Sequence, residues 1–105
     1  DNTDKMDLSS RDYIFPDSNS RYLTDEDLSG YSSDQLELAK NEIYARHGRK
    51  FVTQRIADYF NSKSWYKGTV EPETFDADTS VFNEYEVANI QKIADTEGKL
   101  RSEGK

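Results

Sequence analysis

Residues 32–48 read SSDQLELAKNEIYARHG, and this stretch carries the strongest helix signals in the chain. Ser32 can cap a helix with Gln35 as its capping-box partner, and Gly48 supplies the left-handed residue with which helices often end. The sequence therefore predicts a helix over about 33–47. Its apolar residues recur at the spacing of one helical face: Leu36, Ala39 and Ile43.

The only histidine of the chain falls on the apolar side of this predicted helix. At about 100° per residue, His47 lies roughly 20° from Leu36 on the helical wheel. Arg46 and Tyr44 border the apolar stripe, and Ala45 lies almost opposite to it. We expect His47 to be a hydrogen-bonded core or helix-end residue; the competing interpretation makes it a functional acid, base or ligand.

Three further stretches carry helix-start signals. Thr24 can cap a first turn that Gly30 ends, and Thr53 can cap a helix that precedes the polar stretch 61–64. Asn83 can cap a last helix that runs to Gly98.

The rest of the chain predicts irregular structure. Residues 13–16 are apolar and extended, and residues 68–80, which contain Pro72, predict a loop. The fold class is mainly α: a small single domain of three to four short helices with an N-terminal extended arm or short hairpin. We expect the chain to divide into three parts, which are a flexible tether over 1–12, a helical domain over 13–98 and a frayed tail over 99–105.

Composition limits the class of protein further. A chain of 105 residues fits one small domain. The absence of cysteine excludes disulfides and thiolate chemistry. No stretch approaches the roughly 20 apolar residues of a membrane helix, and the N-terminus lacks a signal-peptide pattern. We expect a soluble chain that does not itself insert into a membrane, and composition leaves its oligomeric state open.

Charge is distributed unevenly along the chain. The net charge is −7 over residues 1–39, +5 over residues 40–67 and −5 over residues 68–105. The simpler interpretation is that the segments fold onto one another and pair their charges. The alternative is an anion site in the basic middle. We expect no binding of nucleic acid, because that function usually needs a face of positive net charge.

The basic middle contains the candidate binding residues. Arg46, Arg49 and Lys50 could bind phosphate, carboxylate or an acidic cell-wall polymer. Trp65 and Tyr66 could add an aromatic platform for a sugar or peptide, with core packing as the alternative.

Neither a metal nor a cofactor is expected. A single histidine without cysteine leaves only carboxylates to complete a zinc site. The stretch 25–30 resembles the start of a calcium loop, but Leu36 stands where the bidentate glutamate belongs. No phosphate-binding glycine loop and no nucleophile elbow is present.

The stretch 38–51, followed by Tyr59-Phe60 and Trp65-Tyr66, resembles the YARHG domain. The resemblance covers about residues 23–97. It implies a small, mainly helical domain on surface or exported proteins of bacteria, often joined to other extracellular or cell-wall modules and sometimes to peptidases. It brings no activity and no ligand, so the motif residues carry over as a signature without roles: Tyr44, Ala45, Arg46, His47 and Gly48.

Together these observations favour a noncatalytic accessory or binding module of a bacterial cell-surface or exported protein. Its partner would be a cell-wall polymer, a peptide or another protein. One alternative is a cell-wall hydrolase or amidase that uses His47 with an acid such as Glu42, although the wheel points Glu42 away from His47. Another is a purely structural spacer.

Overall fold

The computed structural model describes residues 12–78 and 80–104. Within these residues the chain forms five helices and no strand, which confirms the mainly α fold. The tether predicted over residues 1–12 lies outside the described residues except for Asp12, and the division into tether, domain and tail stays a prediction. The helices are α2 (Asp25–Leu28), α3 (Ser33–Ala45), α4 (Gln54–Asn61), α5 (Pro72–Ala77) and α6 (Glu84–Ser102).

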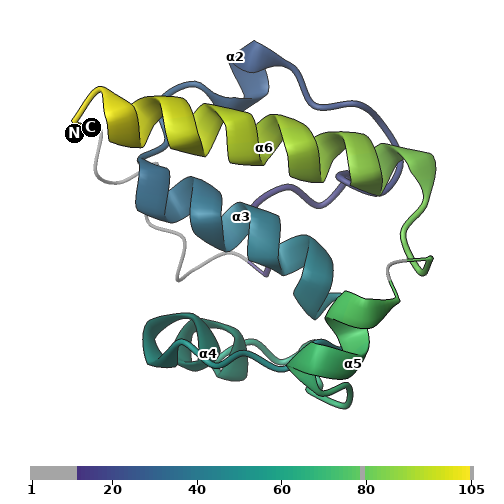
Figure 1. Ribbon diagram of the computed structural model, residues 1–105. Coiled ribbons are helices and arrows are strands. Elements are labelled where there is room, and N and C mark those ends of the chain that lie inside the picture. The colour runs from purple at the N-terminus through teal and green to yellow at the C-terminus, as the bar shows by residue number, and fades with distance from the viewer. Residues whose placement is uncertain (1–11, 79, 105) are drawn as a thin grey trace.

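The centre of the molecule is the pair formed by α3 and α6. Figure 1 shows the two helices side by side, with α2 above α6 in this view and with α4 and α5 below α3. The predicted apolar stripe of α3 faces α6, and Leu36, Ile43 and Ile93 are fully buried between them. The arm and α2 complete this core with Ile14, Phe15, Leu23 and Leu28.

Helix α3 begins where the sequence predicts and ends two residues earlier. Ser32 and Gln35 form the expected capping box. After Ala45 the chain turns through Gly48, which has a φ of 90°. The amide of Gly48 donates to Ala45 and the amide of Arg49 donates to Tyr44, which is the hydrogen-bond pattern of a Schellman motif. A Cβ atom at position 48 would lie only 2.7 Å from the Thr69 hydroxyl, so this turn requires glycine.

Ala45, which lies almost opposite the apolar stripe on the helical wheel, is also packed against a neighbouring helix. Ala45 is 2% exposed and forms a second core cluster with Ile56 and Phe60 of α4. Helix α3 is therefore packed on two sides, by α6 on one and by α4 on the other. A small residue suits the second side because it lets the two helices approach closely.

The loop predicted over residues 68–80 contains a helix, which corrects the prediction. Pro72 stands at the start of α5, where its missing N–H costs no hydrogen bond. Phe75 then packs against both Tyr44 and Phe82 and is 4% exposed. Tertiary packing of this one ring offsets the weak helix signals of an acidic segment.

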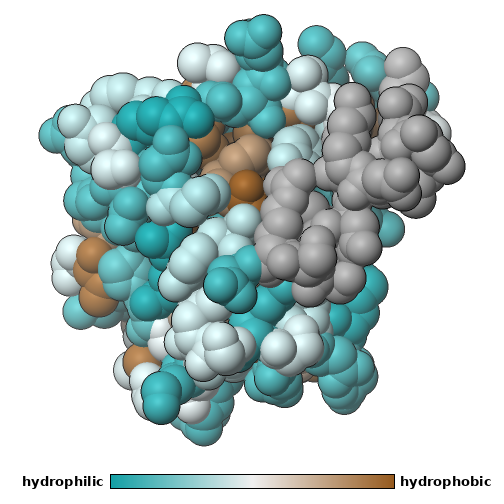
Figure 2. All heavy atoms as spheres, turned by 180° about the vertical axis from the view of Figure 1, so that it is seen from behind, coloured by the Kyte–Doolittle hydropathy of each residue, from teal (hydrophilic) through white to brown (hydrophobic). Residues whose placement is uncertain are grey.

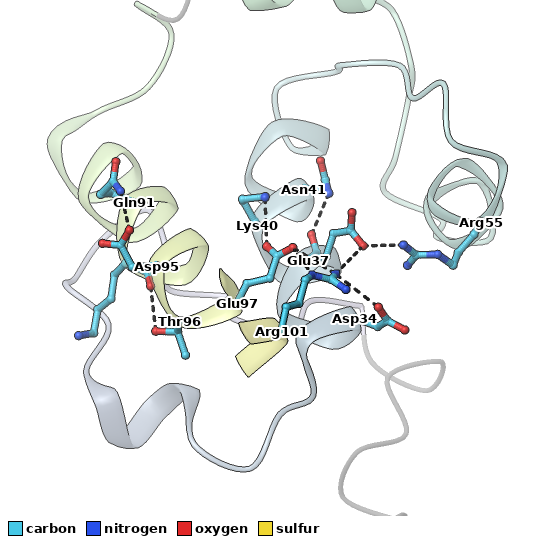
Figure 3. A network of polar contacts seen from close by, with 11 residues as sticks. Asp34, Glu37, Lys40, Asn41, Arg55, Gln91, Asp95, Thr96, Glu97 and Arg101 are labelled. Atoms are coloured by element: carbon cyan, nitrogen blue, oxygen red, sulfur yellow. Dashed lines mark hydrogen bonds and ion pairs between the residues drawn. The ribbon is translucent and has the colours of Figure 1, made fainter. Parts of the chain in front are cut away.

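Helix α6 continues past Gly98 to Ser102, so the predicted helix end is wrong. Figure 3 shows the reason, which is a network of charged side chains around the end of the helix. Arg101 contacts Asp34 and Glu37 of α3 as well as Glu97 of its own helix. Glu37 also pairs with Arg55 of α4, and Glu97 pairs with Lys40 of α3.

The predicted arm is present as an irregular segment without hairpin strands, and two buried side chains hold it. Glu42 of α3 accepts the amides of Ile14 and Phe15 at 2.6 and 3.1 Å. Asn89 of α6 accepts the amide of Leu23 and donates to the carbonyls of Ser18 and Arg21. Glu42 and Asn89 are 0% and 1% exposed. These two side chains supply the hydrogen bonds that a neighbouring β-strand would otherwise supply to the backbone of the arm.

The surface is largely polar. Seen from behind, the molecule is mostly hydrophilic, and its apolar atoms are confined to small areas (Figure 2). No helix in residues 12–78 and 80–104 is long and apolar enough to cross a membrane.

Candidate functional site

His47 joins the end of α3 to the start of α6. Its Nε2 atom lies 2.8 Å from Oε2 of Glu86, and its ring packs edge-on against Phe82 at 5.2 Å. The second oxygen of Glu86 accepts the amide of Asn83 in the capping box that begins α6. The imidazole is partly buried, with a side-chain exposure of 27%. This geometry agrees with a hydrogen-bonded helix-end residue.

Glu42 is not the partner of His47. Its carboxylate faces the arm, as its wheel angle suggests, and both of its oxygens accept backbone amides there. Burial raises the pKa of the Glu42 carboxyl, although the two N–H donors act in the opposite direction. Glu86 belongs to the capping box that begins α6, and its contact with His47 arises only when α3 and α6 pack together.

Arg46 also holds the arm. Its guanidinium lies 4.6 Å from the centre of the Tyr13 ring, and Nη1 donates to the carbonyl of Pro16 at 3.1 Å. The Arg46 guanidinium therefore fixes the arm to the end of α3 through a cation–π contact and a hydrogen bond to a backbone carbonyl.

Arg49 and Lys50 make ion pairs with the acidic segment that follows α4. Arg49 forms two parallel hydrogen bonds of 3.0 Å to the carboxylate of Asp76, which lower the pKa of Asp76. Lys50 lies 2.6 Å from Glu71, and this contact raises the pKa of the lysine. The predicted internal charge pairing is confirmed for these residues.

Trp65 and Tyr66 pack against the second core cluster. Trp65 stacks on Tyr13 with ring centres 4.9 Å apart, and its indole donates to the carbonyl of Asp12 at 2.6 Å. The Tyr66 hydroxyl donates to the carbonyl of Arg49 at 2.7 Å. Both polar tips are thus engaged within the chain, which agrees with the packing interpretation.

A groove of about 670 Å³ opens beside Tyr44, between the ends of α3, α5 and α6. We call it the Tyr44 groove. Its apolar lining contrasts with the polar surface around it, and its rim carries amide, hydroxyl and charged groups. It is lined by Asn41, Tyr44, Arg49, Phe75, Asp76, Phe82, Val87, Ala88, Ile90 and Gln91.

A smaller hollow continues the groove toward α4. The two share Asn41, Tyr44 and Arg49, and the smaller one is also lined by Val52. Val52 and Val87 are 83% and 54% exposed, and they are two of the four large hydrophobic residues that stay exposed in the part of the chain that the structure describes. Exposed apolar side chains therefore collect along this path, as they do at interaction sites.

Two polar groups in the groove are available to a ligand. Among the described residues the Tyr44 hydroxyl has no hydrogen-bond partner, and burial raises its pKa. The Asn41 amide donates to the Glu37 carbonyl, which leaves the oxygen of that amide without a partner in the same part of the chain. An apolar pocket with a few converging polar groups is the usual form of a binding site.

Sequence reasoning missed this groove for an identifiable reason. On the helical wheel Tyr44 only borders the apolar stripe of its helix, and Phe82 and Val87 belong to a distant part of the chain. The groove forms only because α5 carries Phe75 against Tyr44, and α5 was expected to be a loop.

Comparison with known proteins assigns the family. A family model, that of the YARHG domain, matches residues 11–98, which is most of the chain. No curated protein and no solved structure shows a significant match. The matched span contains both sides of the α3–α6 pair and the Tyr44-Ala45-Arg46-His47-Gly48 signature. The chain therefore belongs to the YARHG domain family.

Proposed function

We propose that this chain is a noncatalytic binding module of an exported or cell-surface bacterial protein, and that it holds a peptide, protein or cell-wall partner in the Tyr44 groove. The observation that carries the proposal is the groove itself. It brings the signature residue Tyr44 together with Val87, an exposed apolar residue, and with the unpartnered oxygen of Asn41. The extracellular setting follows from what the family resemblance implies.

Only some of the other candidate binding residues lie close enough to the groove to contact a partner there. Arg49 lies on the rim of the groove, with Lys50 next to it in the chain. Arg46, Trp65 and Tyr66 are engaged with the arm and the second core cluster, so their contribution is to hold the domain together.

Retention on purified cell-wall sacculi and on envelope protein extracts tests the proposal. Val87→Lys places a charge on the apolar lining of the groove, so retention should fall at least about tenfold. Val81→Lys is the matched control, because Val81 is similarly exposed at 49% and does not line the groove. Equal retention of both variants would count against the groove, and no retention of the wild-type chain on any fraction would favour a structural spacer.

The same assay separates the groove from a basic patch. If Lys50 and its neighbours bind an acidic polymer, retention should weaken with added salt and with Lys50→Ala. If the apolar groove dominates, both changes should have little effect.

One observation favours a hydrolase or amidase as a second candidate. A buried carboxylate, Glu86, contacts the imidazole of a partly exposed His47 at 2.8 Å, which is how an acid orients a catalytic histidine. His47→Gln separates the two functions. Loss of cell-wall hydrolysis with an unchanged melting temperature would support catalysis, whereas a lower melting temperature would support the structural role.

A further inference from the structure

We infer that the occupant of the Tyr44 groove is an uncharged, extended peptide segment that inserts a branched aliphatic side chain. This inference rests on the proposed function and names the partner class of the same site. Four features of the groove support it, namely its apolar lining, the angles between its rings, its free polar atoms and its paired charges.

The apolar lining suits a side chain of the size of leucine or valine. The apolar lining consists of Val87 and Ile90 of α6 together with the rings of Phe75 and Phe82. Val87 is more than half exposed, so covering it removes apolar surface from water without moving the core. Val52 extends the apolar path past Tyr44, which fits a chain that runs along the groove more than a compact ligand.

The arrangement of the rings argues against a sugar. Tyr44, Phe75 and Phe82 pack against one another with interplanar angles of 69°, 48° and 67° and ring centres 5.6 to 6.0 Å apart. Two of these pairs are edge-to-face and the Tyr44–Phe82 pair is tilted, so each ring is partly covered by its neighbours. A sugar ring stacks on an open, flat aromatic face, and the contacts within this trio reduce the area of such faces, whereas an aliphatic side chain also packs on ring edges.

The free polar atoms match a peptide backbone. The Asn41 amide oxygen can accept an N–H, and the Tyr44 hydroxyl can donate to a carbonyl. Both residues lie on α3, separated by three positions, and so they project on the same side of the helix. A peptide offers both an N–H and a C=O to such a pair.

The charges around the groove are already neutralised within the chain. Arg49 and Asp76, which both line the groove, are paired with one another, and Lys40, which lines the smaller hollow, is paired with Glu97. A strongly charged ligand would have to break these pairs, and each partner left behind would lose its hydrogen bonds. The electrostatic match is therefore with an uncharged segment.

Titration of the ¹⁵N-labelled 105-residue chain with capped pentapeptides tests the inference. The probes are acetyl-Gly-Gly-X-Gly-Gly-amide with leucine, valine, glycine, lysine or glutamate at X, and a soluble N-acetylglucosamine tetramer serves as the glycan probe. We expect the leucine and valine peptides to shift the amide resonances of Val87, Ala88 and Gln91 with a dissociation constant of about 1 mM. The glycine, lysine and glutamate peptides should bind at least about fivefold more weakly.

Three variants test whether the peptide binds in the Tyr44 groove. Val87→Lys should weaken leucine-peptide binding about tenfold, and Tyr44→Phe about threefold, because it removes only the hydroxyl. Val81→Lys should bind like the wild type. Equal binding of the glycine peptide, or shifts produced by the glycan and not by leucine, would overturn the inference. If envelope fractions retain the chain and no peptide shifts it, the peptide inference fails while the binding function stands; if neither binds, both fail.

Discussion

The polar side chains of α3 are treated differently on the side that faces the arm and on the side that faces α5. On the side toward the arm, Glu42 is fully buried and both of its oxygens accept backbone amides. On the side toward α5, Tyr44 and Asn41 keep polar atoms without partners in the described part of the chain, next to exposed Val87. One helix thus carries a closed side that stabilises the fold and an open side that is available to a partner.

This difference separates stability from function within a single signature. Arg46 and His47 contact the arm and α6, whereas Tyr44 lines the groove. Substitutions on the closed side should therefore change the free energy of unfolding, and substitutions on the open side should change binding. Four predictions test this comparison.

The largest effect is expected for Glu42→Ala. The substitution leaves the amides of Ile14 and Phe15 buried without acceptors and opens a cavity, so the free energy of unfolding should fall by about 3–5 kcal/mol. Urea denaturation followed by circular dichroism measures it. Asp34→Ala, on the exposed face of the same helix, should cost less than about 1 kcal/mol. Similar losses for both variants would remove the distinction between the sides.

Asn89→Ala should cost somewhat less, about 2–3 kcal/mol. The amide of Leu23 and the carbonyls of Ser18 and Arg21 lose a buried partner, but no charge is involved. Gln91→Ala on the outer face of α6 is the control, with an expected change within about 0.5 kcal/mol. Thermal unfolding of both variants and of the wild type measures these losses. If Asn89→Ala is as stable as the wild type, the arm does not depend on this side chain for its position.

A smaller effect is expected from pH. Burial raises the pKa of Glu42 above the ordinary value of 4.5, so the folded chain holds this proton where the unfolded chain has lost it. The contribution to stability is full below pH 4.5 and is lost as the pH rises through the folded pKa. Glu42→Gln lacks this dependence. The difference in unfolding free energy between wild type and Glu42→Gln, measured from pH 4 to 7, should therefore decrease with rising pH; a constant or increasing difference would contradict the assignment.

The smallest effect on stability is expected on the open side. Tyr44→Phe keeps the ring against Phe75 and Phe82 and removes a hydroxyl without a described partner, so unfolding should change by less than about 0.5 kcal/mol. Peptide binding should nevertheless weaken. A clear loss of stability would show that the hydroxyl belongs to the closed part of the fold.

The sequence predicts the helical skeleton well because its signals are local. The capping boxes at Thr24, Ser32 and Asn83 are present, and Gly48 turns the chain as expected. Thr53 stands at the predicted start of α4, but its side chain makes no capping hydrogen bond. Each of these signals depends on residues within a few positions of one another.

The failures share a different cause, which is contact between distant segments. Helix α5 depends on the burial of Phe75, and the last turn of α6 depends on Arg101 reaching α3. The partner of His47 is 39 positions away in the chain, so the helical wheel of α3 could not identify it. The sequence does not reveal the groove for the same reason, since most of its lining comes from three helices that are distant in the chain.

The way in which the arm is held has a consequence for how the chain folds during synthesis. The arm is translated before α6, but the Leu23 amide donates to Asn89, 66 positions later, and the Ser18 carbonyl accepts from the same residue, 71 positions later. Contacts of such long range form late, because they close long loops. The arm is thus made before α6 but docks after it, and it completes the domain only once α6 has been made.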